Sequence, residues 1–208
     1  MARGAFIVIE GLDRSGKTTQ TADLRGKLAA SGNAVKLHKF PDRTTSIGKM
    51  IDSYLQSKSE LDDHAIHLLF SANRWELAFT IEGLLESGTT VLCDRYAFSG
   101  IAFSASKGLP YEWCRSPDIG LPAPDLVLFL DITPEKARER GGYGNERYEK
   151  EEMQRRVREQ YKRIESENIV QWATIDAGRE REQVAADIWA HVEPLVDGIN
   201  HAVAKLWV

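Results

Sequence analysis

The stretch FIVIEGLDRSGKTTQ, residues 6–20, runs from a short apolar segment through a glycine-containing loop into residues with helical periodicity. Its middle part, Gly11 to Thr18, fits the pattern GxxxxGK[ST] of a phosphate-binding loop. Glycines let the backbone wrap a phosphate with its N–H groups pointing inward, and the next helix presents the positive end of its dipole. The spacing predicts Lys17 near the β- and γ-phosphates of a nucleotide and the Thr18 hydroxyl on Mg²⁺. The alternative interpretation is a plain strand-to-helix turn.

Further apolar runs follow the first one and alternate with stretches of helical period. The runs are rich in Val, Ile, Leu or Phe and cover residues 35–40, 90–94, 126–132 and 174–176. The helical stretches include residues 18–30, 61–85 and 146–168. Continuous apolar character is typical of strands that are covered on both faces of a parallel sheet. The alternation therefore predicts an α/β fold in which helices flank an open parallel sheet.

Length and charge narrow the class of protein further. A chain of 208 residues without a linker or repeat favours a single domain, residues 1–208, because domains average roughly 150 residues. The net charge of −4 gives no general attraction to nucleic acid or to an anionic membrane, so an anion site must be built locally. The longest apolar runs are far shorter than the roughly 20 residues needed to cross a bilayer.

The two cysteines and the start of the chain bear on the cellular compartment. Cys93 and Cys114 have a spacing that indicates neither a disulfide framework nor a zinc site, so we expect two reduced, inert thiols. The first residues, MARGAFIVIE, lack the apolar core and cleavage site of a signal peptide. We expect a cytoplasmic protein, with the nucleus as the alternative.

Two segments in the second half of the chain have distinct patterns. Residues 138–149, RERGGYGNERYE, combine glycines with arginines, which makes a poor helix and is typical of a mobile lid over a substrate. Near the end of the chain, apolar residues recur every three or four positions and predict an amphipathic helix that Pro194 kinks or divides. This stripe is expected to pack in the core, without a catalytic role, and consists of Val184, Ile188, Val192, Leu195, Ile199, Val203 and Leu206.

Charged residues follow two of the predicted strands at the ends that face the ligand crevice of a parallel sheet. Asp94 is placed to join a magnesium shell or to accept a proton, and Arg95 to meet an anionic oxygen. The alternative is a local ion pair that closes the strand. Arg43 follows residues 35–40 and brings a second guanidinium to the same edge, unless it is a solvated arginine in a turn.

Phe70 and Arg74 lie four residues apart in a helical stretch and therefore share a face. An aromatic plane beside a fork of donors can stack on a flat base and bond its edge. The alternative is a core phenylalanine under a surface arginine. His64 and His67 are three residues apart, but no third spaced ligand completes a metal site, so we interpret them as polar helix residues.

The predicted lysine and arginines can neutralise the negative charge of two bound nucleotides. A nucleoside triphosphate held against a second phosphate brings roughly six negative charges together, and a partly dehydrated cleft must neutralise them with fixed cations. Mg²⁺, a lid arginine and the following residues would be sufficient: Lys17, Arg14, Arg43, Arg74 and Arg95. A simple nucleotide hydrolase would need fewer arginines outside the phosphate loop.

The chain resembles the thymidylate kinases, most closely their eukaryotic branch, from about residue 5 to residue 176. The strings that carry the resemblance are FIVIEGLDRSGKTTQ, FPDRTTSIGKMI, HLLFSANRWE, LCDRYAFSGIAFS, GLPAPDLVLFLD and GNERYE. The DRYxxSGxAF pattern is considerably more specific than the phosphate loop. The resemblance implies transfer of the ATP γ-phosphoryl group to dTMP to give dTDP. It also implies a P-loop NTPase fold with a five-stranded parallel sheet and a homodimer.

On the ATP side, the resemblance implies that Arg14 reaches the transferred phosphoryl group and that Asp94 is linked to magnesium and to the acceptor phosphate. The stretch from Asp176 to Arg179 would lie beside the adenine. Arg140 and Arg147 flank the lid, and whether they act in catalysis is left open, with Arg14 preferred for that role. The residues expected to bind ATP are Gly11, Arg14, Ser15, Gly16, Lys17, Thr18, Thr19, Arg140 and Arg179.

On the dTMP side, the resemblance implies that Asp13 touches the 3′-hydroxyl and that Tyr148 crowds the sugar C2′ position. Phe70 would stack on the thymine and Arg74 would donate to its edge. The remaining residues expected to bind dTMP are Phe40, Arg43, Arg95, Ser99 and Gly100, of which the two arginines would bind the phosphate. The residues expected to act in catalysis are Lys17, Arg14, Asp94 and Arg95, and those expected at Mg²⁺ are Thr18 and Asp94.

Three other functions are the alternatives. The nearest is another nucleotide or nucleoside kinase with the same phosphate loop and a different acceptor. A nucleotide-gated switch is the alternative from another class, but it predicts a guanine-reading NKxD string, which this sequence lacks. A nucleic-acid motor would need a basic face, which the net charge gives no reason to expect.

Overall fold

The computed structural model describes residues 2–140, 147–148 and 150–208. Within them, five strands form one sheet in the order β2-β3-β1-β4-β5, and every neighbouring pair is parallel. The strands are β1 (Phe6–Gly11), β2 (Val35–Lys39), β3 (Thr90–Asp94), β4 (Leu126–Asp131) and β5 (Trp172–Asp176). The predicted α/β fold with a parallel sheet is confirmed. Residues 141–146 and 149, which make up most of the predicted lid, lie outside the described residues.

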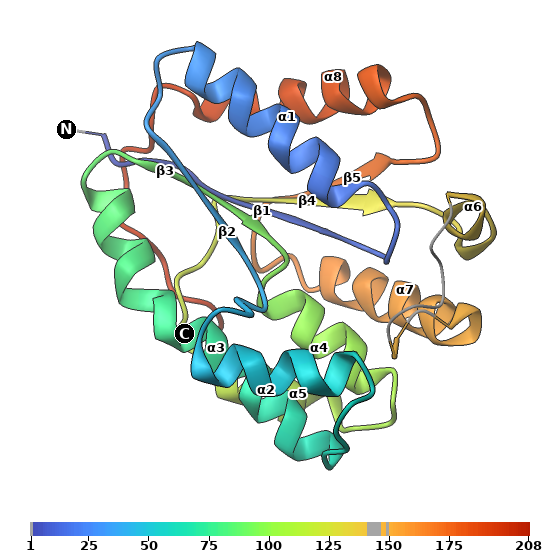
Figure 1. Ribbon diagram of the computed structural model, residues 1–208. Helices are drawn as coiled ribbons and strands as arrows, with labels where there is room; N and C mark the ends of the chain where they lie inside the picture. Colours follow the sequence, from blue (N-terminus) through green and yellow to red (C-terminus); the bar gives the residue numbers. More distant parts are fainter. Residues whose placement is uncertain (1, 141–146, 149) are drawn as a thin grey trace.

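The helices connect and cover the strands. They are α1 (Lys17–Ala30), α2 (Ser46–Leu55), α3 (Asp63–Glu86), α4 (Ala97–Ala105), α5 (Tyr111–Arg115), α6 (Pro134–Glu139), α7 (Glu151–Ser166) and α8 (Arg181–Val192), with the short 3₁₀ turns η1 (Ser116–Asp118) and η2 (Glu193–Leu195). Helices α1 and α8 lie together on one face of the sheet, and α3, α4 and α7 cover the other (Figure 1). Among the described helices, none is long and apolar enough to cross a membrane.

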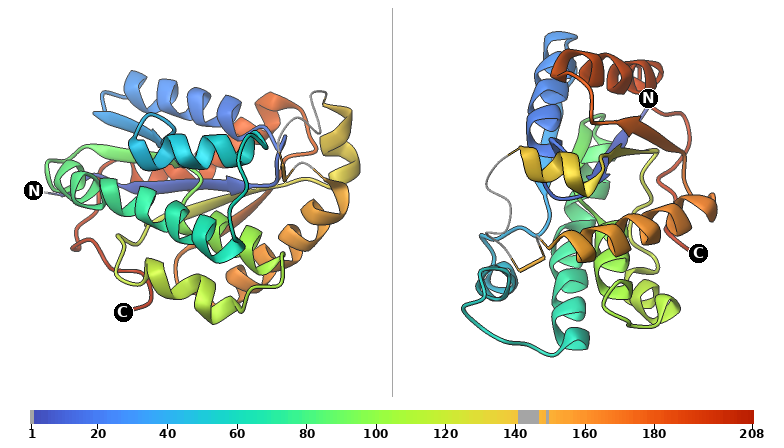
Figure 2. Two further views of the ribbon diagram at one scale, coloured as in Figure 1. Left: turned by 60° about the horizontal axis from the view of Figure 1, so that its bottom comes forward. Right: turned by 90° about the vertical axis from the view of Figure 1, so that its right-hand side faces the viewer.

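The order of the strands sets where loops can meet. The chain passes from central β1 to edge strand β2, returns to β3 and then crosses to β4 on the other side. The strand order therefore reverses beside β1, and open parallel sheets bind ligands at such a switch point, outside the carboxyl ends of the strands. Figure 2 (right) looks toward these ends, with α1 and α8 above the sheet and α4 and α7 below it.

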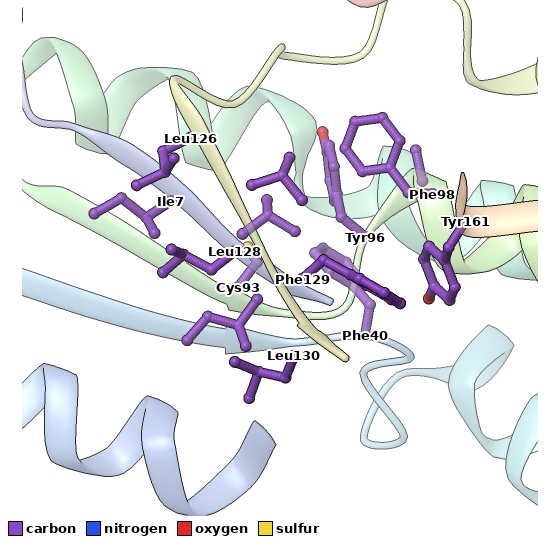
Figure 3. Packing of buried hydrophobic residues seen from close by; sticks show 14 of the residues in the cluster. Ile7, Phe40, Cys93, Tyr96, Phe98, Leu126, Leu128, Phe129, Leu130 and Tyr161 are labelled. Atoms are coloured by element: carbon purple, nitrogen blue, oxygen red, sulfur yellow. The ribbon is translucent and has the colours of Figure 1, made fainter. Parts of the chain in front are cut away.

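The core is built around β1, whose residues are all buried. Phe6 packs edge-on against Tyr96 with ring centroids 5.3 Å apart, and Phe129 of β4 lies 4.7 Å from the ring of Tyr161 on α7. Figure 3 shows Tyr96, Phe129 and Tyr161 among the buried side chains that pack between the sheet and the helices. Cys93 and Cys114 are both free, as expected. Both are also buried, which raises the pKa of each thiol.

Two expectations about the edges of the fold were wrong. Strand β2 is not covered on both faces: it is an edge strand, and each of its residues is half-buried or exposed. The terminal helix does not continue to Leu206: α8 ends at Val192, and Pro194 lies in a 3₁₀ turn. Beyond it the chain forms isolated bridges to Arg3 and Pro122, where the backbone groups of Arg3, Leu121 and Ala123 replace helical hydrogen-bond partners.

The stripe near the end of the chain nevertheless packs in the core, as predicted. Leu206 is fully buried, and its backbone N–H and C=O bond Leu121 and Gly120 at distances of 2.9 Å and 3.0 Å. We therefore expect Leu206→Ala to destabilise the fold by about 2–5 kcal/mol, measured by urea denaturation. Val208→Ala is the control, because Val208 is 91% exposed and should change stability by less than about 0.5 kcal/mol. Equal stability of the two variants would contradict a structural role for the tail.

Candidate active site

Parallel register brings the predicted site residues together at one edge of the sheet. Ile9 of β1 pairs with Asp94 of β3, and Lys39 of β2 pairs with the same aspartate. The backbone N–H of Arg95 then bonds the Ile9 carbonyl at 2.9 Å. The loops that follow β1, β2 and β3 therefore start side by side, as the positions of these residues at strand ends predicted.

The loop between β1 and α1 has the backbone of an anion cradle. Gly11 (φ 151°) and Gly16 (φ 92°) adopt conformations that favour glycine, and a Cβ on Gly11 would lie only 2.7 Å from the Leu130 carbonyl oxygen. Helix α1 begins at Lys17 without a side-chain cap and without an acidic residue in its first turn. The first amides of α1 are therefore available to an anion.

Lys17 is buried and folds back onto the loop that carries it. Its Nζ donates to the carbonyl oxygens of Leu12 (2.5 Å) and Gly11 (3.2 Å). Burial, together with the nearby charge of Arg95, lowers the pKa of Lys17 to about 7, although neighbouring carboxylates act in the opposite direction. A phosphate at this position would supply the negative charge that restores the protonated form.

Asp94 lies at the mouth of the loop, with its side chain only 5% exposed. Its Oδ2 accepts a hydrogen bond from the Thr18 hydroxyl at 3.2 Å and lies 3.7 Å from Lys39 Nζ. Its Oδ1 is buried and has no hydrogen-bond partner among the described residues. An unpartnered carboxylate oxygen beside a threonine hydroxyl is the donor set that Mg²⁺ takes in nucleotide sites, where phosphates and waters complete the shell.

Arg95 and Asp13 form an ion pair across the site. Arg95 Nη2 donates to Asp13 Oδ1, while Nη1 donates to the Gly11 carbonyl oxygen (3.0 Å) and to Ser99 Oγ (3.1 Å). Gln154 of α7 holds the same aspartate, because its Nε2 bonds Asp13 Oδ2 at 2.8 Å and its Oε1 accepts from the Asp13 N–H at 3.0 Å. Both charged side chains are thus fixed in orientation on the cavity wall.

Arg74 is held by a partner that the sequence did not suggest. Its Nε and Nη2 form a fork with the carboxylate of Asp118 at 3.2 Å and 2.6 Å, and both side chains are almost completely buried. Ser71 donates to the same carboxylate at 2.7 Å. Gly100 leaves room for the guanidinium, since a Cβ there would lie 2.7 Å from Arg74 Nη2. The interpretation of Arg74 as a surface residue is therefore wrong.

Arg43 lies at the outer side of the cavity, on the loop that follows β2 and the cis peptide Phe40–Pro41. Its Nη1 donates to Asp52 of α2 at 2.7 Å, and both side chains are about one-third exposed. Buried Asn73 secures this loop, because its Oδ1 accepts from the Asp42 N–H at 2.7 Å. A carboxylate and an amide from two helices therefore set the position of Arg43.

Tyr148 reaches the cavity from the end of the predicted lid. Its hydroxyl lies 3.3 Å from Lys107 Nζ, and its backbone carbonyl accepts from Gln154 Nε2 at 2.9 Å. Neighbouring Arg147 points elsewhere: its Nε donates to the Tyr54 carbonyl oxygen at 2.9 Å, and its guanidinium pairs with Glu60 at 2.7 Å. Arg147 therefore lies at the end of α2 and not at the phosphate loop.

Two further arginines lie on the other side of the phosphate loop. Arg140 Nη1 bonds the Arg14 carbonyl oxygen at 3.2 Å, and its Nη2 donates to the Ala177 carbonyl oxygen. Arg140 therefore links the loop to the residues after β5. Arg179 lies in that segment, where it bonds the Asp176 carbonyl oxygen at 3.3 Å and pairs with Asp187 of α8.

Most of the predicted residues line one cavity of about 380 Å³ at the carboxyl edge of the sheet. They are Asp13, Arg14, Lys17, Thr18, Phe40, Arg43, Phe70, Arg74, Asp94, Arg95, Ser99, Gly100 and Tyr148. The remaining ones lie on the phosphate loop, on the first turn of α1 or beside the loop, and are Gly11, Ser15, Gly16, Thr19, Arg140 and Arg179. The arrangement can hold two anionic groups close together.

The two histidines of α3 lie outside this cavity. His64 is exposed, whereas His67 is buried between Ser104 Oγ and the Cys114 carbonyl oxygen, each at 2.8 Å. Burial lowers the pKa of His67 to about 4, so the ring is neutral at physiological pH. Among the described residues, no group of three His, Cys, Asp or Glu side chains is placed to hold a metal.

Sequence reasoning missed four residues that organise the site, namely Glu10, Asn73, Asp118 and Gln154. Only Glu10 carried a visible signal, because an acidic residue inside an apolar strand is seldom buried without a specific partner. The other three lie in polar or mixed segments, where their spacing is that of ordinary surface residues. Their partners come from distant parts of the chain.

The lowered pKa of Lys17 makes nucleotide binding dependent on pH. Because bound phosphate favours the charged amine, binding of a nucleoside triphosphate should take up a proton above pH 7. The dissociation constant should therefore rise by up to about tenfold per pH unit until the pKa of the bound state is reached. Calorimetric titrations in buffers of different ionisation enthalpy measure this uptake. Lys17→Arg is the control, since its guanidinium does not titrate, and equal uptake by both proteins would contradict the assignment.

Comparison with known proteins identifies the family and agrees with the fold. A model of the thymidylate kinase family matches residues 9–188. Thymidylate kinases from Danio rerio and Homo sapiens are 48% and 47% identical to this chain, over 99% and 98% of its length and 98% and 95% of theirs. The solved thymidylate kinase of Candida albicans superposes with a TM-score of 0.89 at 39% identity, covering 99% of both chains. The chain therefore belongs to the thymidylate kinase family, nucleotide kinases that phosphorylate dTMP to dTDP.

Proposed function

We propose that ATP binds on the phosphate loop and dTMP in the adjoining cavity, so that the two nucleotides lie end to end. The observation that carries this proposal is the shared cavity, which contains both Lys17 of the loop and the pair Phe70 and Arg74. A phosphate-binding cradle and an aromatic ring beside a guanidinium thus open into one space. In-line transfer requires donor and acceptor to be aligned in such a space.

The base of dTMP is assigned to the inner end of the cavity. Phe70 offers a half-buried ring for stacking, and the Nη1 of Arg74 is the part of its guanidinium that Asp118 does not bind. Because the Arg74 fork is buried and paired, it supplies directed donors without reorganisation when the base arrives. Asp13 and Tyr148 would then face the sugar, at its 3′-hydroxyl and its C2′ position.

The phosphate of dTMP is assigned to Arg95 and Arg43, which lie on two different loops of the cavity. Arg14 and Lys17 would stabilise the phosphoryl group in transit, and Arg140 would close the far side of the phosphate loop. Arg179 would lie beside the adenine. A loose phosphoryl transition state needs charge neutralisation and alignment more than a strong base, so Asp94 has no obligatory role as a proton acceptor.

Mg²⁺ is the metal that the donor set fits. The Thr18 hydroxyl and the unpartnered Oδ1 of Asp94 would hold it, directly or through water. When bound, the ion would neutralise charge on the β- and γ-phosphate oxygens. We also propose that the chain works as one domain in the cytoplasm or nucleus, where its two buried thiols stay reduced.

Removing the Phe70 ring tests the assignment of the base. We expect Phe70→Ala to raise the KM for dTMP about tenfold or more, because stacking is lost, while the KM for ATP changes by less than about twofold. Steady-state kinetics with each substrate varied in turn measure both values. His64→Ala on the same helix is the control, since His64 is exposed and lies outside the cavity. An equal rise in KM for both substrates would contradict the assignment of the base.

We further propose that α3 is the contact between two copies of this chain in a homodimer. Leu68, Trp75 and Phe79 lie on one face of α3, at spacings of seven and four residues, and all three are exposed. Phe79 is 87% exposed, which is unusual for an aromatic side chain on a rigid helix. A helix that presents the same stripe on each copy can form the self-complementary interface of a two-fold dimer.

A charge on this stripe should separate the two copies. Phe79→Asp is expected to give a monomer, because an isolated carboxylate would be buried in the interface. Sedimentation velocity at micromolar concentration reports the mass. Gln183→Asp introduces the same charge at an exposed position of α8, on the opposite face of the sheet from α3, and it should leave the mass unchanged. A dimer that persists in Phe79→Asp would rule out this face.

A further inference from the structure

A buried polar cluster lies directly behind the phosphate loop. It consists of Glu10 at the end of β1, Ser99 on α4 and Tyr161 on α7, and we call it the Glu10 cluster. Glu10 and Tyr161 are completely buried, and none of the roles assigned above uses either residue. A buried carboxylate costs several kcal/mol unless donors surround it, so its presence needs an explanation.

One oxygen of the carboxylate caps α4. Glu10 Oε1 accepts from the backbone N–H groups of Tyr96 (2.9 Å) and Ser99 (3.1 Å), at a helix start where no side chain of α4 itself provides a cap. The residue just before this start is Arg95, which has a left-handed backbone with φ 69°. Such a conformation costs a non-glycine residue about 1–3 kcal/mol and persists only where its surroundings fix it. The cap fixes the residues that follow Arg95.

The other oxygen holds the hydroxyl that receives the Arg95 side chain. Glu10 Oε2 accepts from Ser99 Oγ at 2.5 Å and from Tyr161 Oη at 2.8 Å. The hydroxyls of Ser99 and Tyr161 are also 2.8 Å apart, so the three oxygens form a closed triangle. Ser99 Oγ donates into this triangle and therefore presents a lone pair to Arg95 Nη1 at 3.1 Å. Burial raises the pKa of Glu10, while Ser99 and Arg95 act against this rise.

The anchoring of Arg95 is asymmetric, and this asymmetry matters for the substrate. Nη1 bonds Ser99 Oγ and the Gly11 carbonyl oxygen, neither of which is assigned to the substrate phosphate. Nη2 meets Asp13, which is itself assigned to the sugar of dTMP. When dTMP binds, Nη2 can therefore exchange its partner, while Nη1 keeps the guanidinium in place.

We propose that Tyr161 and Glu10 are positioning residues that act through Ser99 to orient Arg95 toward the acceptor phosphate. This inference rests on the proposed phosphate role of Arg95. Neither residue touches the cavity, since its lining includes Ser99 and Arg95 but not Glu10 or Tyr161. The cluster supplies orientation, and orientation has a large effect on phosphoryl transfer because misplacement of a charged group by about 1 Å can cost about 100-fold in rate.

The variant Tyr161→Phe removes one hydroxyl and keeps the ring that packs on Phe129. We expect kcat/KM for dTMP to fall about tenfold, with the KM for ATP unchanged within about twofold. Glu10→Gln should have a larger effect of the same kind. Donors bond both Oε1 and Oε2 of Glu10, and an amide has only one oxygen that can accept from them. Tyr111→Phe is the matched control, since Tyr111 on α5 is buried as well and its ring packs against the guanidinium of Arg163, at 3.7 Å, instead of in the Glu10 cluster.

A double-mutant cycle with Arg95→Lys separates positioning from a merely structural role. A lysine cannot make the Nη1 contacts, so Tyr161→Phe should change kcat/KM by less than about twofold in that background. An equal tenfold loss in both backgrounds, or no loss in the parent, would overturn the proposal. If Tyr161→Phe fails to fold, Ser99→Ala replaces it in the same cycle, because it removes the Nη1 acceptor directly. If Arg95→Lys alone has full activity, the proposed phosphate role of Arg95 fails instead.

Discussion

The parallel pairing of β1 between β3 and β4 is the interaction on which the site depends. It places the end of β1 next to the end of β3. The phosphate loop that follows β1 therefore begins beside Asp94 and Arg95. Parallel strands leave all their carboxyl ends on one side, and the connecting helices must return across the faces. The strand order therefore decides where the cavity lies, and the side chains of the loops line it.

Each acceptor-side guanidinium is tethered by a carboxylate, but to a different degree. The pair Arg74–Asp118 is buried, the pair Arg95–Asp13 is partly buried and the pair Arg43–Asp52 is about one-third exposed. A buried ion pair is costly to break and keeps one orientation. An exposed ion pair contributes little to stability, and its side chains exchange partners easily. The end of the cavity assigned to the base is thus rigid, and the end assigned to the phosphate can exchange partners.

The strands and the phosphate loop could be predicted because their signals are local. Apolar runs, glycines at fixed offsets and a lysine before a threonine need no distant partner to be recognised. The extended tail and the half-exposed β2 could not be predicted in the same way. Residues 199–206 keep the helical spacing of apolar residues, but the backbone groups of Arg3, Leu121 and Ala123 bind them as extended chain. The periodicity of apolar residues indicates which side of a segment is buried, but it does not indicate which backbone groups the segment bonds.

The sequence by itself determined the family, the parallel α/β fold, the phosphate loop and the identity of the charged residues at strand ends. The tertiary structure alone decided which side chain holds which charged group: Asp118 holds Arg74, Gln154 holds Asp13, and Glu10 holds Arg95 through Ser99. The physical reason is that a hydrogen bond depends on position and angle within a few tenths of an ångström. Residues such as Glu10 and Tyr161, 151 positions apart in the chain, meet only once the sheet and its helices have packed.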